Sequence, residues 1–149
     1  PRSYLNIDSL DTVADFIKSN FDLLRLETDF EEFVVDNQTY KNVIGSLNTH
    51  LTKRIIIGAH YDACGEMPAA DDNASAVAVM IECARQLSKL KEQINYRIDF
   101  VAFTLEEPPY FGSSNMGSYI CAKNLADQQA NVKLMINLEM VGYLKAGLE

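Results

Sequence analysis

The sequence of 149 residues lacks the cysteine pattern of a disulfide framework or a thiolate metal site. Its three cysteines are scattered, and no two of them have C-x-x-C spacing. Cys83 and Cys121 fall in helical patterns and are expected to be small core residues, whereas the role of Cys64 stays open. Cysteine chemistry is therefore not the expected basis of function.

Long hydrophobic runs and excess positive charge are also lacking. No stretch approaches the ~20 apolar residues of a membrane-spanning helix, so no membrane span is predicted. The net charge is −8, which argues against nucleic acid or an anionic membrane surface as the main partner. The length suits one domain with a substantial core, and a hydrophobic fraction of 48% is typical of globular proteins.

Patterns typical of strands alternate with patterns typical of helices along the chain. This alternation predicts an α/β fold, with a largely parallel sheet and helices on its faces. The expected strands are 28–35 and 39–47 around a turn at 36–38, then three buried strands at 54–59, 98–105 and 132–138. The expected helices begin near residues 8 and 73, and a third spans about 113–126.

Residues that can bind a metal follow each of the three buried strands. His60 and Asp62 follow the first, Glu106 and Glu107 the second, and Glu139 the third. Ligands of open α/β sheets bind at the carboxyl ends of the strands, so these side chains are expected to share one crevice.

Asp71 and Asp72 precede a predicted helix and are expected to reach the same crevice. Two carboxylates ~4 Å apart repel by roughly 4 kcal/mol at an effective dielectric of about 20, so such a cluster favours a bound cation. One imidazole with several carboxylates suits zinc, with manganese or cobalt as possible substitutes.

Each of these residues also has a simpler structural explanation. An Asp-Asp-Asn run before a helix is ordinarily an N-cap, a Glu-Glu pair is usually solvated, and a lone histidine at a strand end is more often structural than a ligand. Glu139 could be an edge charge or the partner of a lysine. The combined order, spacing and placement nevertheless favour a metal site.

Three segments together resemble the co-catalytic zinc aminopeptidases, a family of zinc-dependent exopeptidases that includes glutamate carboxypeptidases and glutaminyl cyclases and is related to bacterial leucyl aminopeptidases. The segments are 55–62 (IIIGAHYD), 70–76 (ADDNASA) and Glu106-Glu107 before Pro108. The resemblance implies a mixed, mainly parallel β-sheet sandwiched by helices. It also implies two zinc ions and hydrolysis of N-terminal residues from peptides that have a free N-terminus.

The resemblance also implies a role for each motif residue. His60 and Glu139 would bind one zinc, Glu107 would bind the second, and Asp71 would bridge both. The family often has aspartate where Glu139 stands, which is expected to alter the geometry of the site without loss of binding. Glu106 would be the general base for a metal-held water.

Two supporting features also follow from the resemblance. Asp62 would lie behind His60 and fix its tautomer and basicity. The peptide bond between Asp71 and Asp72 is expected to be cis.

The chain has only two histidines, and His50 precedes its strand and so is poorly placed for the crevice. The family's two-metal site uses a second histidine further downstream, and its full members are longer. Residues 1–149 are therefore expected to be the N-terminal part of a single catalytic domain, impaired or inactive alone.

Three functions stay open at this point. The favoured one is a zinc aminopeptidase, because an acidic site attracts an α-ammonium group, whereas a carboxypeptidase would want an arginine-rich pocket and none of the five arginines is next to a candidate metal-binding residue in sequence. The second is a single-zinc acyl-transfer enzyme such as a glutaminyl cyclase. The third is a non-catalytic family member that binds or assembles. Side-chain preference, oligomeric state and compartment are not determined by the sequence.

Overall fold

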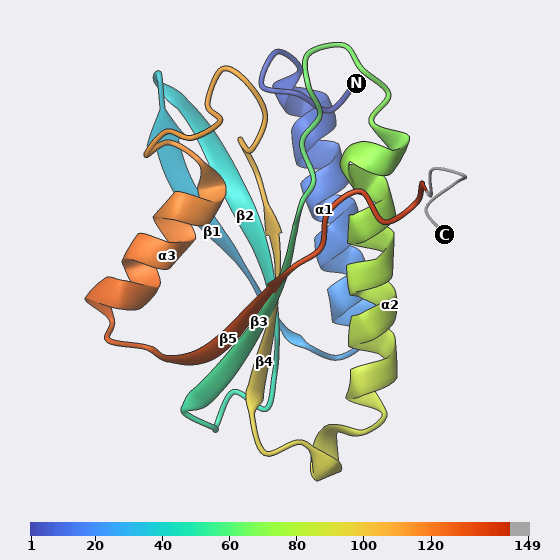
Figure 1. Ribbon diagram of the computed structural model, residues 1–149, viewed down its shortest axis with the longest axis vertical. Coiled ribbons are helices and arrows are strands. Elements are labelled where there is room, and N and C mark those ends of the chain that lie inside the picture. Colours follow the sequence, from blue (N-terminus) through green and yellow to red (C-terminus); the bar gives the residue numbers. More distant parts are fainter. Residues whose placement is uncertain (144–149) are drawn as a thin grey trace, which may run out of the picture.

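A five-stranded mixed sheet forms the centre of the protein in the computed structural model, which describes residues 1–143 (Figure 1). The strand order is β1-β2-β4-β3-β5. The strands are β1 (Glu27–Val35), β2 (Gln38–Leu47), β3 (Lys53–His60), β4 (Arg97–Phe103) and β5 (Asn131–Asn137). The helical elements are α1 (Ile7–Leu23), the π-helical turn η1 (Ala70–Ser75), α2 (Ala76–Ser88), the 3-10 turn η2 (Lys91–Gln93) and α3 (Gly117–Asp127).

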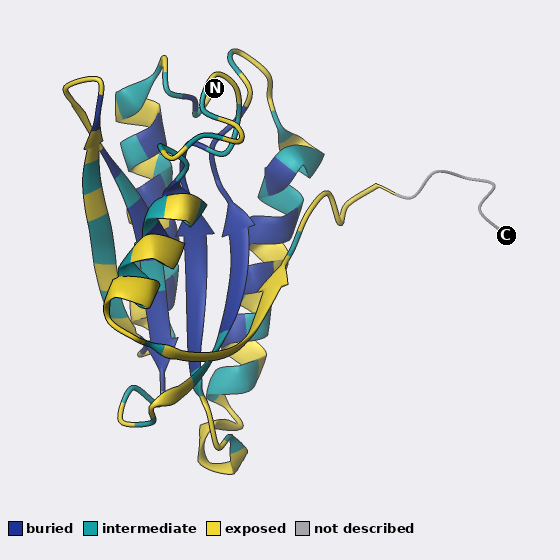
Figure 2. Cartoon of the chain, turned by 60° about the vertical axis from the view of Figure 1, so that its left-hand side comes forward, coloured by how far each residue is buried: buried dark blue, intermediate teal, exposed yellow. Residues whose placement is uncertain are grey.

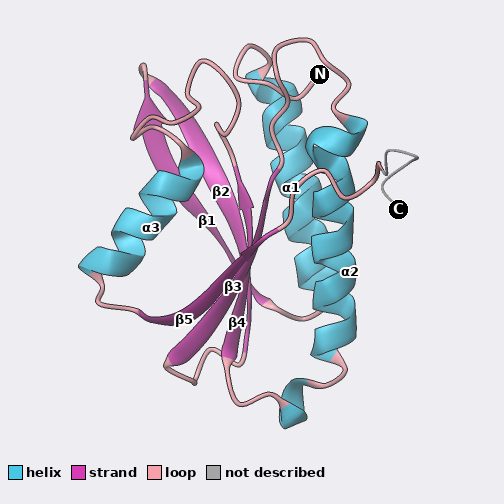
Figure 3. Ribbon diagram, in the orientation of Figure 1, coloured by secondary structure: helices cyan, strands magenta, loops and turns pink. Residues whose placement is uncertain are grey.

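The sheet has a parallel part and an antiparallel part. Strand β3 pairs in parallel with both β4 and β5, whereas β2 pairs antiparallel with β1 and β4. Helices α1 and α2 cover one face and α3 covers the other, as Figure 3 shows. The expected α/β architecture, a mixed sheet sandwiched by helices, is confirmed.

The core is divided by the two buried central strands. Phe100 of β4 points toward α1 and α2, while its neighbour Val101 packs on the opposite face with Cys121 of α3. Strands β3 and β4 therefore have few exposed positions, which explains the continuous apolar runs in their sequences (Figure 2). Strand β5 is exposed along its whole length, although it is rich in apolar residues.

Three local boundaries differ from the sequence-based expectation. Helix α3 begins at Gly117 instead of near residue 113, because residues 107–116 form turns and bends. The β1–β2 hairpin turns over two residues, Asp36 and Asn37, which both have positive φ, so Gln38 already belongs to β2. The α2 helix begins at Ala76 instead of near residue 73, because Asp72 and Asn73 adopt non-helical backbone angles. None of the helices within residues 1–143 is both long and apolar enough to cross a membrane.

We expect the packing of α1 on the sheet to dominate the stability of this face. Phe21 is fully buried, and its ring lies 6.2 Å from the ring of Phe100. Replacing Phe21 with alanine should lower the free energy of unfolding by about 3–5 kcal/mol, because the lost contacts leave a cavity. Urea denaturation measures the change. Leu23→Ala on the same helix is the control and should cost under about 0.5 kcal/mol, because Leu23 is 82% exposed. Equal losses in both variants would contradict this account.

Candidate active site

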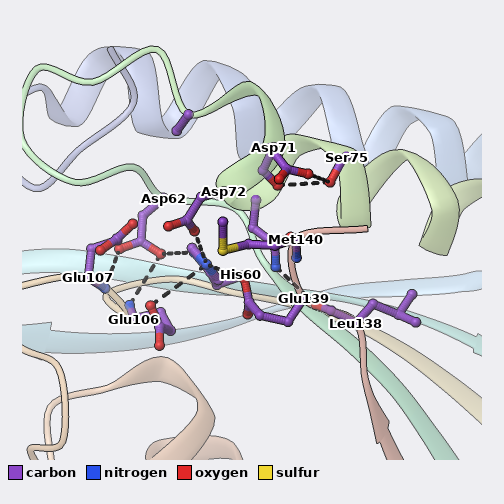
Figure 4. A network of polar contacts seen from close by, with 12 residues as sticks. His60, Asp62, Asp71, Asp72, Ser75, Glu106, Glu107, Leu138, Glu139 and Met140 are labelled. Atoms are coloured by element: carbon purple, nitrogen blue, oxygen red, sulfur yellow. Dashed lines mark hydrogen bonds and ion pairs between the residues drawn. The ribbon is translucent and has the colours of Figure 1, made fainter. Parts of the chain in front are cut away.

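His60 lies at the carboxyl end of β3, and three acidic side chains face its Nε2 atom (Figure 4). The distances are 3.0 Å to Asp72 Oδ1, 3.5 Å to Glu139 Oε1 and 3.7 Å to Glu106 Oε2. His60 is 3% exposed, so its ring has little access to water. The sheet edge thus brings together residues that are up to 79 positions apart in sequence, from His60 to Glu139.

Asp62 lies on the other side of the imidazole ring. Its Oδ1 atom is 3.4 Å from His60 Nδ1, and its two oxygens accept the backbone N–H groups of Glu106 at 3.2 Å and Glu107 at 3.1 Å. Asp62 is 2% exposed. This buried carboxylate therefore orients the ring and also fixes the segment that carries both glutamates.

Burial raises the pKa of Glu106 and of Glu107, and nearby carboxylates raise both further. For Glu106 these carboxylates are mainly Asp62, Glu139 and Asp72, while the positive charge of His60 acts in the opposite direction. A carboxyl group with a raised pKa is a better proton acceptor and donor near neutral pH than an ordinary glutamate.

Asp72, and not Asp71, joins the cluster. One ligand atom from each of His60, Asp72 and Glu107 lies within 4.8 Å of the others. Asp71 points away, and its Oδ1 accepts the backbone N–H of Gly142 at 2.7 Å and the hydroxyl of Ser75 at 3.1 Å (Figure 4). The structure therefore gives Asp72 the position that the sequence-based interpretation assigned to Asp71.

The cis peptide bond is also one residue further along than expected. It joins Asp72 to Asn73, so the expectation for Asp71-Asp72 was wrong. The non-helical angles of Asp72, with φ −101° and ψ 90°, interrupt the helical path and turn successive side chains in different directions. Sequence alone shows two adjacent aspartates but not which of them faces the sheet.

Asn73 is a site residue that sequence reasoning missed. It is fully buried, donates from Nδ2 to the carbonyl of Leu138 at 2.9 Å, and accepts the N–H of Met140 at 3.1 Å. These two bonds hold the residues on either side of Glu139. The sequence pattern of an N-cap concealed this role, because no local signal shows which backbone groups a buried asparagine will bind.

The cluster fits a divalent metal on its own chemistry. Nδ1 of His60 is buried and lacks a properly directed hydrogen bond among the described residues, although Asp62 lies close to it. Burial alone would lower the pKa of His60, but Asp62, Glu106 and Glu139 raise it to about 9. One imidazole nitrogen and several carboxylate oxygens form a donor set suited to zinc.

His50 lies outside this site. It sits in the turn between β2 and β3, before the first residue of β3, whereas His60 is the last residue of that strand. The two histidines are therefore at opposite ends of β3, and His60 is the histidine of this cluster.

A cavity of about 210 Å³ adjoins the cluster on the side of α3. His60, Glu106 and Glu139 line it together with the apolar side chains of Phe103, Met116 and Met135. The cavity lining therefore combines acidic and apolar side chains. A larger apolar groove of about 430 Å³ lies between α1 and α2 and contains none of the acidic residues of the cluster.

Comparison with known proteins gives consistent matches. The sequence matches Peptidase family M28 over residues 42–148. It is 38% identical over 151 residues to uncharacterized protein YfbL of Escherichia coli, covering 96% of this chain and 45% of that protein. It is 36% identical over 109 residues to aminopeptidase YwaD of Bacillus subtilis, covering 71% and 23%. The chain thus spans less than half the length of these relatives.

Solved structures show the same fold. A zinc-dependent exopeptidase from Parabacteroides distasonis superposes with a TM-score of 0.78 at 25% identity, covering 95% of this chain and 56% of that one. A glutaminyl cyclase from Bacteroides thetaiotaomicron superposes with a TM-score of 0.77 at 22% identity, covering 95% and 57%.

We expect zinc affinity to distinguish the two aspartates. Asp72→Asn should weaken zinc binding by about a hundredfold or more, because it removes a charged ligand that faces His60. Asp71→Asn is the matched control and should change affinity less than about threefold, because an amide oxygen can still accept the Gly142 N–H. Competition with a chromogenic chelator measures both. The reverse order of effects would restore Asp71 as the ligand.

Zinc binding should release a proton from His60. Because the pKa of His60 is raised to about 9, the metal-free ring is protonated at neutral pH and cannot act as a ligand. Affinity should therefore rise with pH by up to about tenfold per unit until pH approaches 9. The same raised pKa stabilises the metal-free fold fully below about pH 6.5, the ordinary value, and this stabilisation is lost as pH rises toward 9.

Calorimetry in buffers of different ionisation enthalpy would count the released protons. His50→Gln should release the same number as the unaltered protein. Zinc binding without proton release at pH 7 would contradict the raised pKa of His60.

Proposed function

Because the chain belongs to Peptidase family M28, we propose that it carries most of the active site of a zinc-dependent aminopeptidase that removes N-terminal residues from peptides. The observation that supports this most is the convergence of His60, Asp72 and Glu107 at the carboxyl edge of the sheet, with Glu139 3.5 Å from His60. The named relatives include an aminopeptidase, which favours the same reaction class.

In this proposal the residues present would hold two ions. His60 and Glu139 would bind one ion, Glu107 would bind the other, and Asp72 would lie between them. When bound, zinc supplies Lewis-acid stabilisation of negative charge and lowers the pKa of a water molecule. The second ion would have fewer protein ligands in this chain, so we propose that residues 1–149 alone retain it weakly and turn over slowly at most.

Glu106 would act as the general base. Its Oε2 atom is 3.7 Å from His60 Nε2, close to the ligands, and burial raises its pKa. It would take a proton from the attacking water and deliver it to the leaving amine. Asp62 would hold the Glu106 backbone in place during both transfers, because its Oδ1 atom accepts that residue's N–H.

The charge of the site favours a substrate with a free α-ammonium group. Glu106 and Glu139 line the 210 Å³ cavity together with Phe103 and Met135, so the cavity would suit the N-terminal residue of a peptide with an apolar side chain. Arg2 is the arginine near the motifs, but its Nε, Nη1 and Nη2 atoms already bind backbone carbonyls. It is therefore poorly suited to bind a substrate carboxylate, which argues against carboxypeptidase action.

A single-zinc acyl-transfer reaction, such as that of a glutaminyl cyclase, is the second candidate. It is favoured by the compact set of His60, Asp72 and Glu107, which could hold one ion. The presence of Glu139 at a further 3.5 Å contact with His60 favours the two-ion arrangement instead.

Glu106→Gln should test the proposed mechanism in the full-length protein. We expect the hydrolysis of leucine p-nitroanilide to fall about 10²–10⁴-fold, because glutamine cannot accept the proton, while the zinc content stays unchanged. Glu32→Gln on the exposed side of β1 is the control and should leave both quantities unaltered. An unimpaired rate in Glu106→Gln would exclude Glu106 as the base. Ammonia release from N-terminal glutaminyl peptides, without hydrolysis of the anilide, would favour the cyclase.

A further inference from the structure

Arg2 ties the start of the chain to both ends of the loop that joins β3 to η1. Its Nε atom donates to the carbonyl of Tyr61 at 2.6 Å, Nη1 to that of Pro68 at 3.0 Å, and Nη2 to that of Ala69 at 2.7 Å. The backbone carbonyl of Arg2 in turn accepts the N–H of Ala63 at 3.0 Å. A single side chain therefore bridges backbone positions that are eight residues apart.

The positions that Arg2 binds are those next to the metal-binding residues. Tyr61 directly follows His60, and Ala69 lies three residues before Asp72. Residues 61–63 of this loop are buried, whereas residues 64–69 have no regular structure and contain no buried residue, so packing does little to fix the path of this second part. The guanidinium group thus sets the separation between the two chain segments that must meet at the metal.

The positive charge of Arg2, like its hydrogen bonds, favours the close approach of the acidic residues. The guanidinium is half-buried at the edge of the apolar groove between α1 and α2, and this burial lowers its pKa, while the negative charges of Asp62 and Asp72 act in the opposite direction and favour its charged form. A positive charge held there reduces the repulsion among the clustered carboxylates when no metal is bound.

We propose that Arg2 is a positioning residue that holds His60 and Asp72 at a metal-binding separation before zinc binds. This role rests on the proposed zinc site. The planar guanidinium matters because it presents three donors in fixed directions, whereas the ammonium group of lysine is a single point that cannot span the same three carbonyls. Arg2 itself touches neither the metal-binding atoms nor the proposed substrate cavity.

Zinc affinity of Arg2 variants in the full-length protein tests the proposal. Arg2→Ala should weaken zinc binding about 10–100-fold, the range found when groups that orient metal ligands are removed. Arg2→Lys should recover part of the loss, because it restores charge but not the three-way contact. Arg85→Ala is the matched control and should leave affinity unchanged, because Arg85 pairs with Glu82 on the exposed side of α2. At saturating zinc, the peptidase rate of Arg2→Ala should return to near that of the unaltered protein.

Hydrogen exchange in the zinc-free protein provides a second measurement that does not depend on metal. The amides of residues 62–69 should exchange faster in Arg2→Lys than in the unaltered protein, and the amides of β3 should not. Unchanged zinc affinity in Arg2→Ala, or a uniform increase in exchange over the whole chain, would overturn the positioning role alone. An unaltered protein that binds no zinc would overturn both this role and the proposed function. If Arg2→Ala does not fold, Arg2→Lys and its exchange pattern decide the question.

Discussion

The buried carboxylate of Asp62 connects the two strand ends on which the candidate site depends. It follows β3, faces the imidazole of His60, and accepts the backbone N–H groups of Glu106 and Glu107 after β4. A carboxylate that is 2% exposed is costly unless it is paired and hydrogen-bonded, and here these partners meet that requirement. Because the same group approaches the ring and binds the backbone of both glutamates, a displacement of Asp62 would move His60, Glu106 and Glu107 together.

The other residues of the site offset the electrostatic repulsion among its carboxylates. Asp72, Glu106 and Glu139 all approach one imidazole nitrogen. Although burial lowers the pKa of His60, Asp62, Glu106 and Glu139 outweigh it and raise the pKa, so they favour a positive charge on the ring. A zinc ion would take the place of that proton. Arg2, which binds the loop between β3 and η1, contributes a second positive charge. Asn73 binds the backbone on either side of Glu139 without adding charge. Neutral and cationic groups thus hold the acidic residues where repulsion alone would separate them.

The fold was predictable because its signals are local. A strand buried on both faces requires a continuous apolar run, and β3 and β4 each have one. The helical period of α2 likewise lies within a short stretch of consecutive residues. The rule that ligands bind at the carboxyl ends of the strands in α/β sheets also predicts from sequence that His60, Glu106 and Glu139 lie together. The helix α2 begins three residues later than expected, because Asp72 and Asn73 adopt non-helical backbone angles that their residue types do not reveal.

The fold class, the family resemblance and the residue types that meet at the sheet edge can all be read from the order and spacing of residues along the chain. The choice between Asp71 and Asp72 requires the three-dimensional arrangement, because their side chains diverge through backbone angles that adjacent identical residues do not reveal. The roles of Asn73 and Arg2 likewise depend on bonds to carbonyl groups some 60 positions away. Contacts between residues so far apart in sequence form only when the strands and loops pack together, and no local sequence pattern encodes them.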